Sequence, residues 1–258
     1  MTKIKMKLMQ MLPEGTVFVA FILTLLCLFA GTQRNLLDSA NIMTLYTPEE
    51  GSSAHNFYSV HLMSYCQGTL GTIDPGVPGV TRNVTSCSSR TILFSFDPTQ
   101  AWPKEITQGP ALEWPRVISD DFQAFRLTSR AMAVLYCIAV VAMGGMLLVR
   151  VWAFLSPNKQ QHVLELPFML DTTVIQLGAL SLSIASIIAT VLAFEFVALI
   201  NAHGKGSNVS AEYGDKFLGM TWAAVSLLIV GSAAKFLTMF GSGQQTVTAA
   251  PAKDTEEG

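Results

Sequence analysis

Two cysteines carry the clearest chemistry in this sequence of 258 residues. Cys66 and Cys87 share one polar segment, whereas the other two cysteines, Cys27 and Cys137, lie inside long apolar stretches. In an oxidising compartment two lone cysteines so placed pair as a disulfide, and the alternative is two free or metal-linked thiols. Closing a loop of this length restrains the unfolded chain by about 3 kcal/mol. We therefore predict a Cys66–Cys87 disulfide, with Cys27 and Cys137 as small apolar core residues.

Two sequons for N-linked glycosylation accompany the cysteines. Asn83-Val84-Thr85 lies between Cys66 and Cys87, and Asn208-Val209-Ser210 lies in a later, short polar segment. The N-x-S/T pattern marks a glycosylation site on an exported surface. The sequence therefore predicts glycosylation at Asn83 and Asn208 if both segments are outside the cell.

No pattern in the sequence indicates enzymatic chemistry. His-Glu-x-x-His, Gly-x-Ser-x-Gly and phosphate-binding glycine loops are absent from it. The four histidines are scattered, and His61 with the two loop cysteines lacks the close spacing of a zinc site. We expect no catalytic residues, no metal and no cofactor.

Four long apolar stretches must position these residues. They lie at 15–31, 131–149, 174–200 and 217–240, and each is near the roughly 20 residues that a helix needs to cross a bilayer. None has the polar stripe of a soluble amphipathic helix. Half of the residues are apolar and only 13% are charged, with a formal net charge of −2, so no nucleic-acid partner is expected. The sequence predicts a membrane all-α protein, a four-transmembrane-helix bundle in a single domain at 1–240.

Two signals set the orientation in the membrane. Lys3, Lys5 and Lys7 precede the first stretch and favour a cytosolic N-terminus. Four spans then place 32–130 outside as a loop subdomain, and both sequons also fall outside. The tail 241–258 is polar, and we predict it to be cytosolic and disordered. One alternative is that the first stretch is a cleaved signal peptide, which leaves the same loop outside.

Glu195 is the candidate for a functional charge within the membrane. Such residues are costly in lipid and commonly face a partner or water. Glu195 lies near the predicted outer end of the third stretch, so the alternative is a carboxylate that reaches the interface. Lys235 lies near the inner end of the fourth stretch, where snorkelling is expected.

Small residues recur every four positions in the third stretch. They are Ser181, Ala185, Ala189 and Ala193. Small side chains let membrane helices approach closely. The pattern predicts a helix-packing face, either within the bundle or between copies of the protein.

The first loop contains segments that are rich in strand-forming residues. Asn41–Tyr46, Phe57–Tyr65 and Thr91–Phe96 favour strands, and turn formers fill Gly71–Gly79 between the cysteines. A helix is predicted from about Ser119 into the second span. We expect a small antiparallel β-sheet that contains the disulfide. Trp102 and Trp114 follow in a proline-rich stretch and suit a membrane interface or a partner contact.

The order of the loops resembles the claudin-like plan, in which a large first extracellular loop holds one cysteine pair. Phe57–Gly68 (Phe-Tyr-Ser-Val-His-Leu-Met-Ser-Tyr-Cys-Gln-Gly), Cys87-Ser88 and Phe94–Pro98 (Phe-Ser-Phe-Asp-Pro) are similar to the fungal SUR7/PalI family of four-span plasma-membrane proteins. The claudin Gly-Leu-Trp is absent, with Met63-Ser64-Tyr65 in its place, so we expect no tight-junction role. The short tail differs from the long-tailed pH-signalling branch.

The resemblance implies a non-enzymatic organiser of cortical membrane domains, with roles in eisosome-type patches and cell-wall integrity. Expected partners are membrane lipids, further copies or other membrane proteins, and cell-wall or cytosolic cortical proteins. The alternatives are a transporter or channel subunit that uses Glu195, and a pH-signalling membrane sensor.

Overall fold

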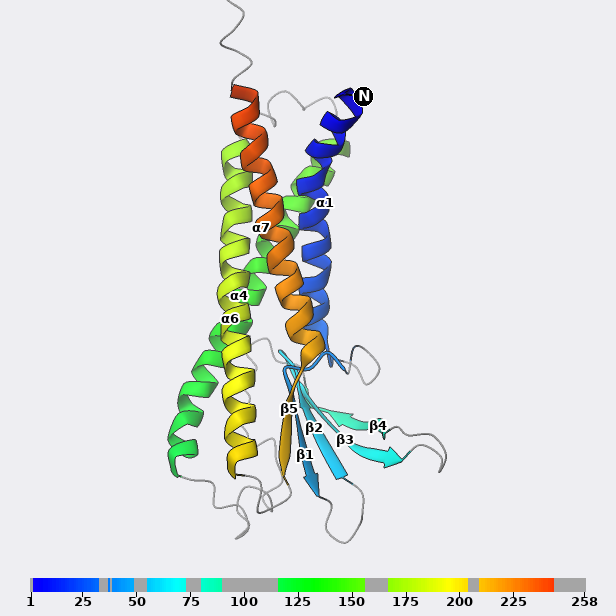
Figure 1. The fold of residues 1–258 in the computed structure, drawn as a ribbon, viewed down its shortest axis with the longest axis vertical. Helices are drawn as coiled ribbons and strands as arrows, with labels where there is room; N and C mark the ends of the chain where they lie inside the picture. The colour runs from blue at the N-terminus through cyan, green and yellow to red at the C-terminus, as the bar shows by residue number, and fades with distance from the viewer. Residues whose placement is uncertain are drawn as a thin grey trace, which may run out of the picture.

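The structure is a computed structural model, and it describes residues 2–32, 37, 39–48, 55–72, 80–89, 116–155, 167–203 and 209–243. The described residues form a bundle of long helices with an antiparallel sheet at one end (Figure 1). The helices are α1 (Thr2–Phe29), α4 (Arg116–Leu155), α6 (Pro167–His203) and α7 (Asp215–Gly243).

Each helix contains one of the predicted apolar stretches. Three segments are long and apolar enough to cross a membrane, namely Leu127–Trp152, Thr173–Ala202 and Asp215–Leu237. Glu14–Phe29 in α1 is a shorter apolar segment that packs beside them. The predicted four-helix membrane bundle is thus confirmed, with a short first span.

Small side chains make the bundle core tight. Six helix alanines are fully buried where helices meet: Ala20, Ala139, Ala185, Ala189, Ala193 and Ala224. Larger buried side chains such as Met143, Leu182 and Leu228 fill the space between these contacts. Close backbone approach is the packing expected where lipid supplies no hydrophobic driving force between helices.

A polar contact joins three helices inside this core. The Tyr136 hydroxyl of α4 lies 2.5 Å from Thr221 Oγ1 of α7, which lies 2.8 Å from Ser186 Oγ of α6. Tyr136, Ser186 and Thr221 are fully buried. Because hydrocarbon offers no partner to a hydroxyl, the three side chains satisfy one another.

Charged residues mark the two ends of the apolar bundle. Arg150 of α4 forms an ion pair with Glu14 of α1, with 3.6 Å between Nη1 and Oε1. Arg130 lies twenty positions earlier on α4 (150 − 130 = 20), which is about 30 Å at helical rise and equals the thickness of a hydrocarbon core. Residues of α4 before Arg130 therefore extend beyond the membrane on the side of the sheet.

The sheet has five antiparallel strands in the order β4-β3-β2-β1-β5. They are β1 (Met43–Pro48), β2 (His55–Val60), β3 (Tyr65–Thr72), β4 (Val80–Cys87) and β5 (Ser210–Tyr213). They confirm the predicted antiparallel sheet of the first loop. Two of the strands were not predicted: β4, and β5, which comes from the short loop between α6 and α7 and pairs with β1.

One face of the sheet packs on the C-terminal end of α6. Phe196, Val197 and Ile200 form a second buried cluster with alternate residues of the strands. Those strand residues are Met43, Leu45, Tyr58, Val60 and Ala211. The predicted third span at 174–200 therefore includes a helical turn that contacts protein instead of lipid, and Figure 1 shows α6 continuing beside β5 and β1.

Several predicted segments have different limits in the structure. The segment Phe57–Tyr65 is divided between β2 and β3, with a tight turn at His61–Ser64. α4 begins at Arg116, slightly before the predicted Ser119. α7 ends at Gly243, and the rest of the predicted tail lies outside the described residues, as do Thr91–Phe96, Trp102 and Trp114.

Candidate functional site

The disulfide joins neighbouring strands of the sheet. Cys66 of β3 and Cys87 of β4 are direct partners in the register, and their sulfur atoms are 2.04 Å apart. The predicted Cys66–Cys87 disulfide is confirmed. Beyond the bridge, the Ser88 N–H donates to Tyr65 O at 2.8 Å, and the Tyr65 N–H donates to Ser88 Oγ at 3.1 Å. The hairpin is therefore closed by a covalent bond and two hydrogen bonds at its bundle-side end.

The turn between β2 and β3 connects this hairpin to the helices. All four turn residues, His61, Leu62, Met63 and Ser64, are buried, and the His61 N–H donates to Ser64 O at 2.8 Å. Leu62 and Met63 belong to the apolar cluster of the helix bundle. The sheet is thus inserted into the outer end of the bundle by its own turn, which sets its position relative to the helices.

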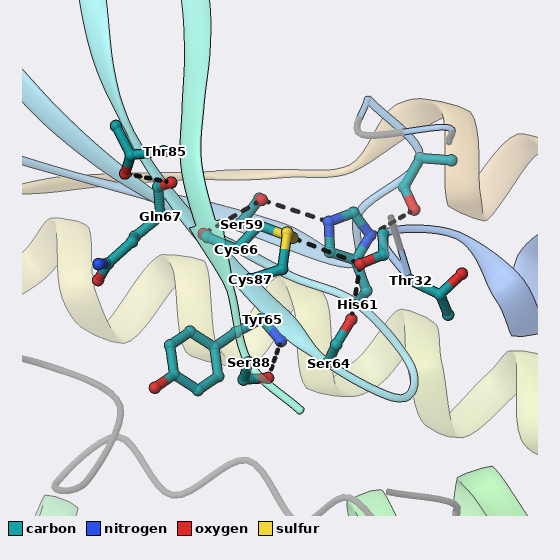
Figure 2. The surroundings of a disulfide bond; sticks show 12 residues. Thr32, Ser59, His61, Ser64, Tyr65, Cys66, Gln67, Thr85, Cys87 and Ser88 are labelled. Atoms are coloured by element: carbon teal, nitrogen blue, oxygen red, sulfur yellow. Dashed lines mark hydrogen bonds between the residues drawn. A yellow bond between two sulfur atoms is a disulfide. The ribbon is translucent and has the colours of Figure 1, made fainter. Parts of the chain in front are cut away.

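Gly31, two residues beyond the end of α1, contacts both the turn and the disulfide. Its φ of 69° ends the helix in the left-handed conformation that glycine adopts without strain. Its carbonyl accepts a hydrogen bond from Ser64 Oγ at 2.9 Å and lies 3.4 Å from Cys66 Sγ. The His61 ring fills the space that a side chain at position 31 would need. Figure 2 shows His61, Ser64 and Thr32 beside the disulfide.

His61 connects the turn to two further segments. Its Nδ1 lies 3.2 Å from the Ala40 carbonyl, and its Nε2 lies 3.3 Å from Ser59 Oγ. Because a carbonyl only accepts, Nδ1 carries the proton of the first bond. The Ser59 hydroxyl also lies 3.4 Å from Cys66 O, and its single proton can be donated either to that carbonyl or to Nε2. The imidazole therefore bridges the segment before β1, strand β2 and the disulfide strand, as drawn in Figure 2.

The second loop is tied to the first through β5. The side-chain amide of Asn201, near the end of α6, donates to Ala211 O at 2.9 Å and accepts from the Ala211 N–H at 2.8 Å. The Gly214 N–H donates to Ile42 O at 2.9 Å, and Lys216 Nζ donates to Ser39 Oγ at 3.0 Å. Both loops thus form one body with the helix ends.

A charged cluster crosses the opposite face of the sheet. Tyr46 Oη donates to Glu212 Oε2 at 2.9 Å, and the Arg82 guanidinium donates to Tyr46 Oη. Arg82 also lies 4.0 Å from Glu212 and covers the rings of Tyr46 and Phe57 at 5.7 and 5.8 Å. Partial burial raises the pKa of Tyr46, as does its hydrogen bond to Glu212, while Arg82 opposes the rise. The cluster links β4, β1 and β5 across the whole sheet.

Most of this chain matches a known protein family. Residues 10–234 match the SUR7/PalI family. This span runs from α1 into α7 and includes the sheet and the disulfide.

The chain belongs to the SUR7/PalI family.

The family predicted from the first loop is therefore confirmed. SUR7/PalI proteins are a structural membrane family, and the comparison with curated proteins found no match. In this SUR7/PalI protein, the buried turn His61–Ser64 and Gly31 hold the sheet against the four helices.

The remaining predicted site residues lie apart from this junction. Ser181, Ala185, Ala189 and Ala193 are all buried inside the bundle. Asn83 is exposed in the middle of β4, whereas Asn208 lies outside the described residues. Within the described part of the chain, no group of three His, Cys, Asp or Glu residues is placed to hold a metal ion.

Glu195 lies at the outer edge of the membrane segment. α6 and α7 run in opposite directions and meet at Ser186 and Thr221. Glu195 is nine positions beyond Ser186 (195 − 186 = 9), which is about 14 Å along α6 at helical rise. α7 begins only six positions from Thr221, at Asp215 (221 − 215 = 6). Glu195 therefore lies beyond the level at which α7 begins. Its side chain is exposed, and the next residue, Phe196, packs on the sheet. Glu195 therefore lies near the sheet-side end of the Thr173–Ala202 segment, beside residues that pack on the sheet.

The sequence analysis overlooked the residues that hold the junction together. Gly31 carries a recognisable signal, because a glycine that directly follows an apolar helix commonly caps it. Asn201 and Ser64 carry none, since a single polar residue near a helix end or in a loop has many possible partners. His61 was considered only as a metal ligand, and it instead makes buried hydrogen bonds.

Proposed function

We propose that this protein is a non-enzymatic organiser of plasma-membrane domains in a fungal cell, of the cortical, eisosome-type kind. Its membership of the SUR7/PalI family supports this role. The observation that carries the proposal is the rigid junction of the sheet and the bundle. A loop held by a buried turn, a disulfide and β5 presents one fixed surface outside the membrane, as a scaffold requires.

The proposed orientation places the sheet outside the cell and both termini in the cytosol. The sheet, with Asn83 in β4, is at one end of the bundle, while the start of α1 and the end of α7 are at the other (Figure 1). A disulfide and an N-terminal lysine cluster are both consistent with this orientation. α1 is retained under this proposal, because its buried Val17, Ala20 and Thr24 complete the bundle core.

Lateral assembly is proposed to use the lipid-facing sides of the helices. The small-residue face of α6 is already occupied within the bundle. Exposed apolar side chains instead cover α4, among them Val141, Leu148 and Trp152. These surfaces contact membrane lipids and, in a patch, further copies or other membrane proteins. The sheet is the proposed surface for cell-wall partners, and the tail for cytosolic cortical partners.

Transport is the competing function, and it depends on a charge within the membrane. The exposed position of Glu195, next to residues that pack on the sheet, supports the scaffold over transport. Under the scaffold proposal, Glu195→Gln leaves membrane patches and solute fluxes unchanged. A flux that disappears in this variant would favour a transporter.

The scaffold proposal is tested by imaging the full chain with a fluorescent tag at its C-terminus in the native cell. We expect stable cortical patches that recover slowly after photobleaching, and a uniform, freely diffusing signal would contradict the proposal. Gly31→Ala should reduce the patch fraction, because it disrupts the junction. Gly15→Ala is the matched control, since a side chain there meets no neighbouring atom. Surface biotinylation normalises both variants for the amount of protein delivered.

A further inference from the structure

The five-stranded sheet has two edges, and each edge exposes backbone groups that can pair with another chain. The edge strands are β4 and β5. Proteins protect such edges with short strands, charges, prolines or covering groups, because an open edge is a template for aggregation.

The β5 edge is protected by the protein itself. β5 has only four residues. The Asn201 side chain bonds both the N–H and the carbonyl of Ala211, as a neighbouring strand would. α6 also lies directly beside this strand, and its outer end contributes to the same buried cluster as Ala211. This edge therefore has little free pairing capacity.

Among the described residues, the β4 edge shows none of these protections. β4 has eight residues, Val80–Cys87, and contains no proline. Its one charged residue, Arg82, lies across the sheet face toward Tyr46 and Glu212 and does not guard the edge. In the part of the chain that the structure describes, β4 pairs only with β3. Valine and threonine are frequent in β4, and both favour strand pairing.

One sequon lies within the β4 edge strand, and the last residue of the other belongs to the β5 edge strand. Asn83 lies in the middle of β4, and both Asn83 and Thr85 are exposed. Ser210, the third residue of the other sequon, is the first residue of β5. The three inner strands contain no sequon. An N-linked glycan is bulky and strongly hydrated, so at Asn83 it would stand beside the open edge.

We propose that Asn83 carries an N-linked glycan whose role is to block strand pairing at the β4 edge. The donor is a lipid-diphosphate-linked oligosaccharide. The Asn83 amide nitrogen attacks its first sugar carbon, the N-glycosidic bond forms, the bond to the lipid diphosphate breaks, and the amide loses one proton. The inference rests on the proposed orientation, with the sheet outside the cell.

The first experiment measures whether the site is occupied. The full-length protein, purified from its host cells, is compared with and without peptide-N-glycosidase by intact mass. We expect a mass loss that decreases by one glycan in Asn83→Gln and Thr85→Ala but not in Thr85→Ser, which keeps the sequon. An unmodified Asn83 in a protein with an intact Cys66–Cys87 disulfide overturns the glycan proposal alone. An unmodified protein with free thiols at both cysteines overturns the proposed orientation as well.

The second experiment measures what the glycan does. We expect Asn83→Gln and Thr85→Ala to increase the weight-average mass of the detergent-solubilised protein at least twofold by light scattering. Asn83→Lys removes the glycan but places a charge on the edge, so it should restore the mass of the unmodified protein. If the mass is the same with and without the glycan, or if Asn83→Lys associates as strongly as Asn83→Gln, edge protection is refuted.

Discussion

The junction between α1 and the sheet gives the sharpest prediction, the destabilisation of the protein by Gly31→Ala. Gly31 has a φ of 69°, and its missing side chain is replaced by the His61 ring. Alanine in the left-handed conformation costs about 1–2 kcal/mol. Forcing a methyl group into a filled core adds about 1–3 kcal/mol. We expect a total loss of about 2–5 kcal/mol in the free energy of unfolding.

A double-mutant cycle separates the two contributions. His61→Ala alone should cost about 2–4 kcal/mol, because it leaves a cavity and the buried Ala40 carbonyl without its imidazole donor. With the ring gone, the methyl group of Gly31→Ala has space, and only the backbone cost remains. The double variant should therefore be more stable than the sum of the single variants by about 1–3 kcal/mol.

The assay is unfolding of the full-length protein in mixed micelles, followed by tryptophan fluorescence at increasing denaturing detergent. Gly15→Ala is the control and should be neutral or stabilising, since alanine favours a helix. Equal stability of Gly31→Ala and Gly15→Ala would refute the account of the junction. An additive cycle would show that the His61 ring does not limit the space at position 31.

Three further predictions concern the other contacts. Cys66→Ser should lower the free energy of unfolding by about 3 kcal/mol, and a variant that unfolds at the same detergent concentration as the wild type under non-reducing conditions would contradict this. Tyr136→Phe should cost only about 0.6 kcal/mol and at most about 1.7, because one hydrogen bond to Thr221 is lost within the membrane; a loss above 3 kcal/mol would indicate repacking instead. Asn201→Ala should cost about 1–2 kcal/mol and increase amide exchange at Ala211, while Asn201→Asp keeps the acceptor and should cost less. Unchanged exchange in Asn201→Ala would show that the amide does not hold β5.

Local features of the sequence predicted the membrane helices, the disulfide and strand β1. The apolar stretches identified the bundle because a membrane span needs only length and composition. The disulfide was predictable because Cys66 and Cys87 are the two cysteines outside those stretches. The segment Asn41–Tyr46 predicted β1 to within two residues at each end, since strand-forming residues cluster there.

Long-range contacts escaped prediction. β5 consists of four residues with no distinctive pattern, and it forms a strand only because β1 and Asn201 lie beside it. The outer end of α6 resembles a continuation of the membrane span, because an apolar residue that contacts lipid has the same type as one that contacts a sheet. The sequence likewise leaves two alternatives for Glu195, a functional charge within the membrane or a carboxylate at the interface, and the structure shows its side chain exposed beside residues that pack on the sheet.

By itself, the sequence determined that this is a four-span membrane protein of the SUR7/PalI family with one disulfide in its first loop. Hydropathy, cysteine placement and the residues around Cys66 are local properties, and each can be read without knowing the neighbours. Only the tertiary structure decided how the loop is held. The left-handed Gly31, the buried His61–Ser64 turn and the Asn201 amide act on residues far away in the chain, and folding alone brings those residues together.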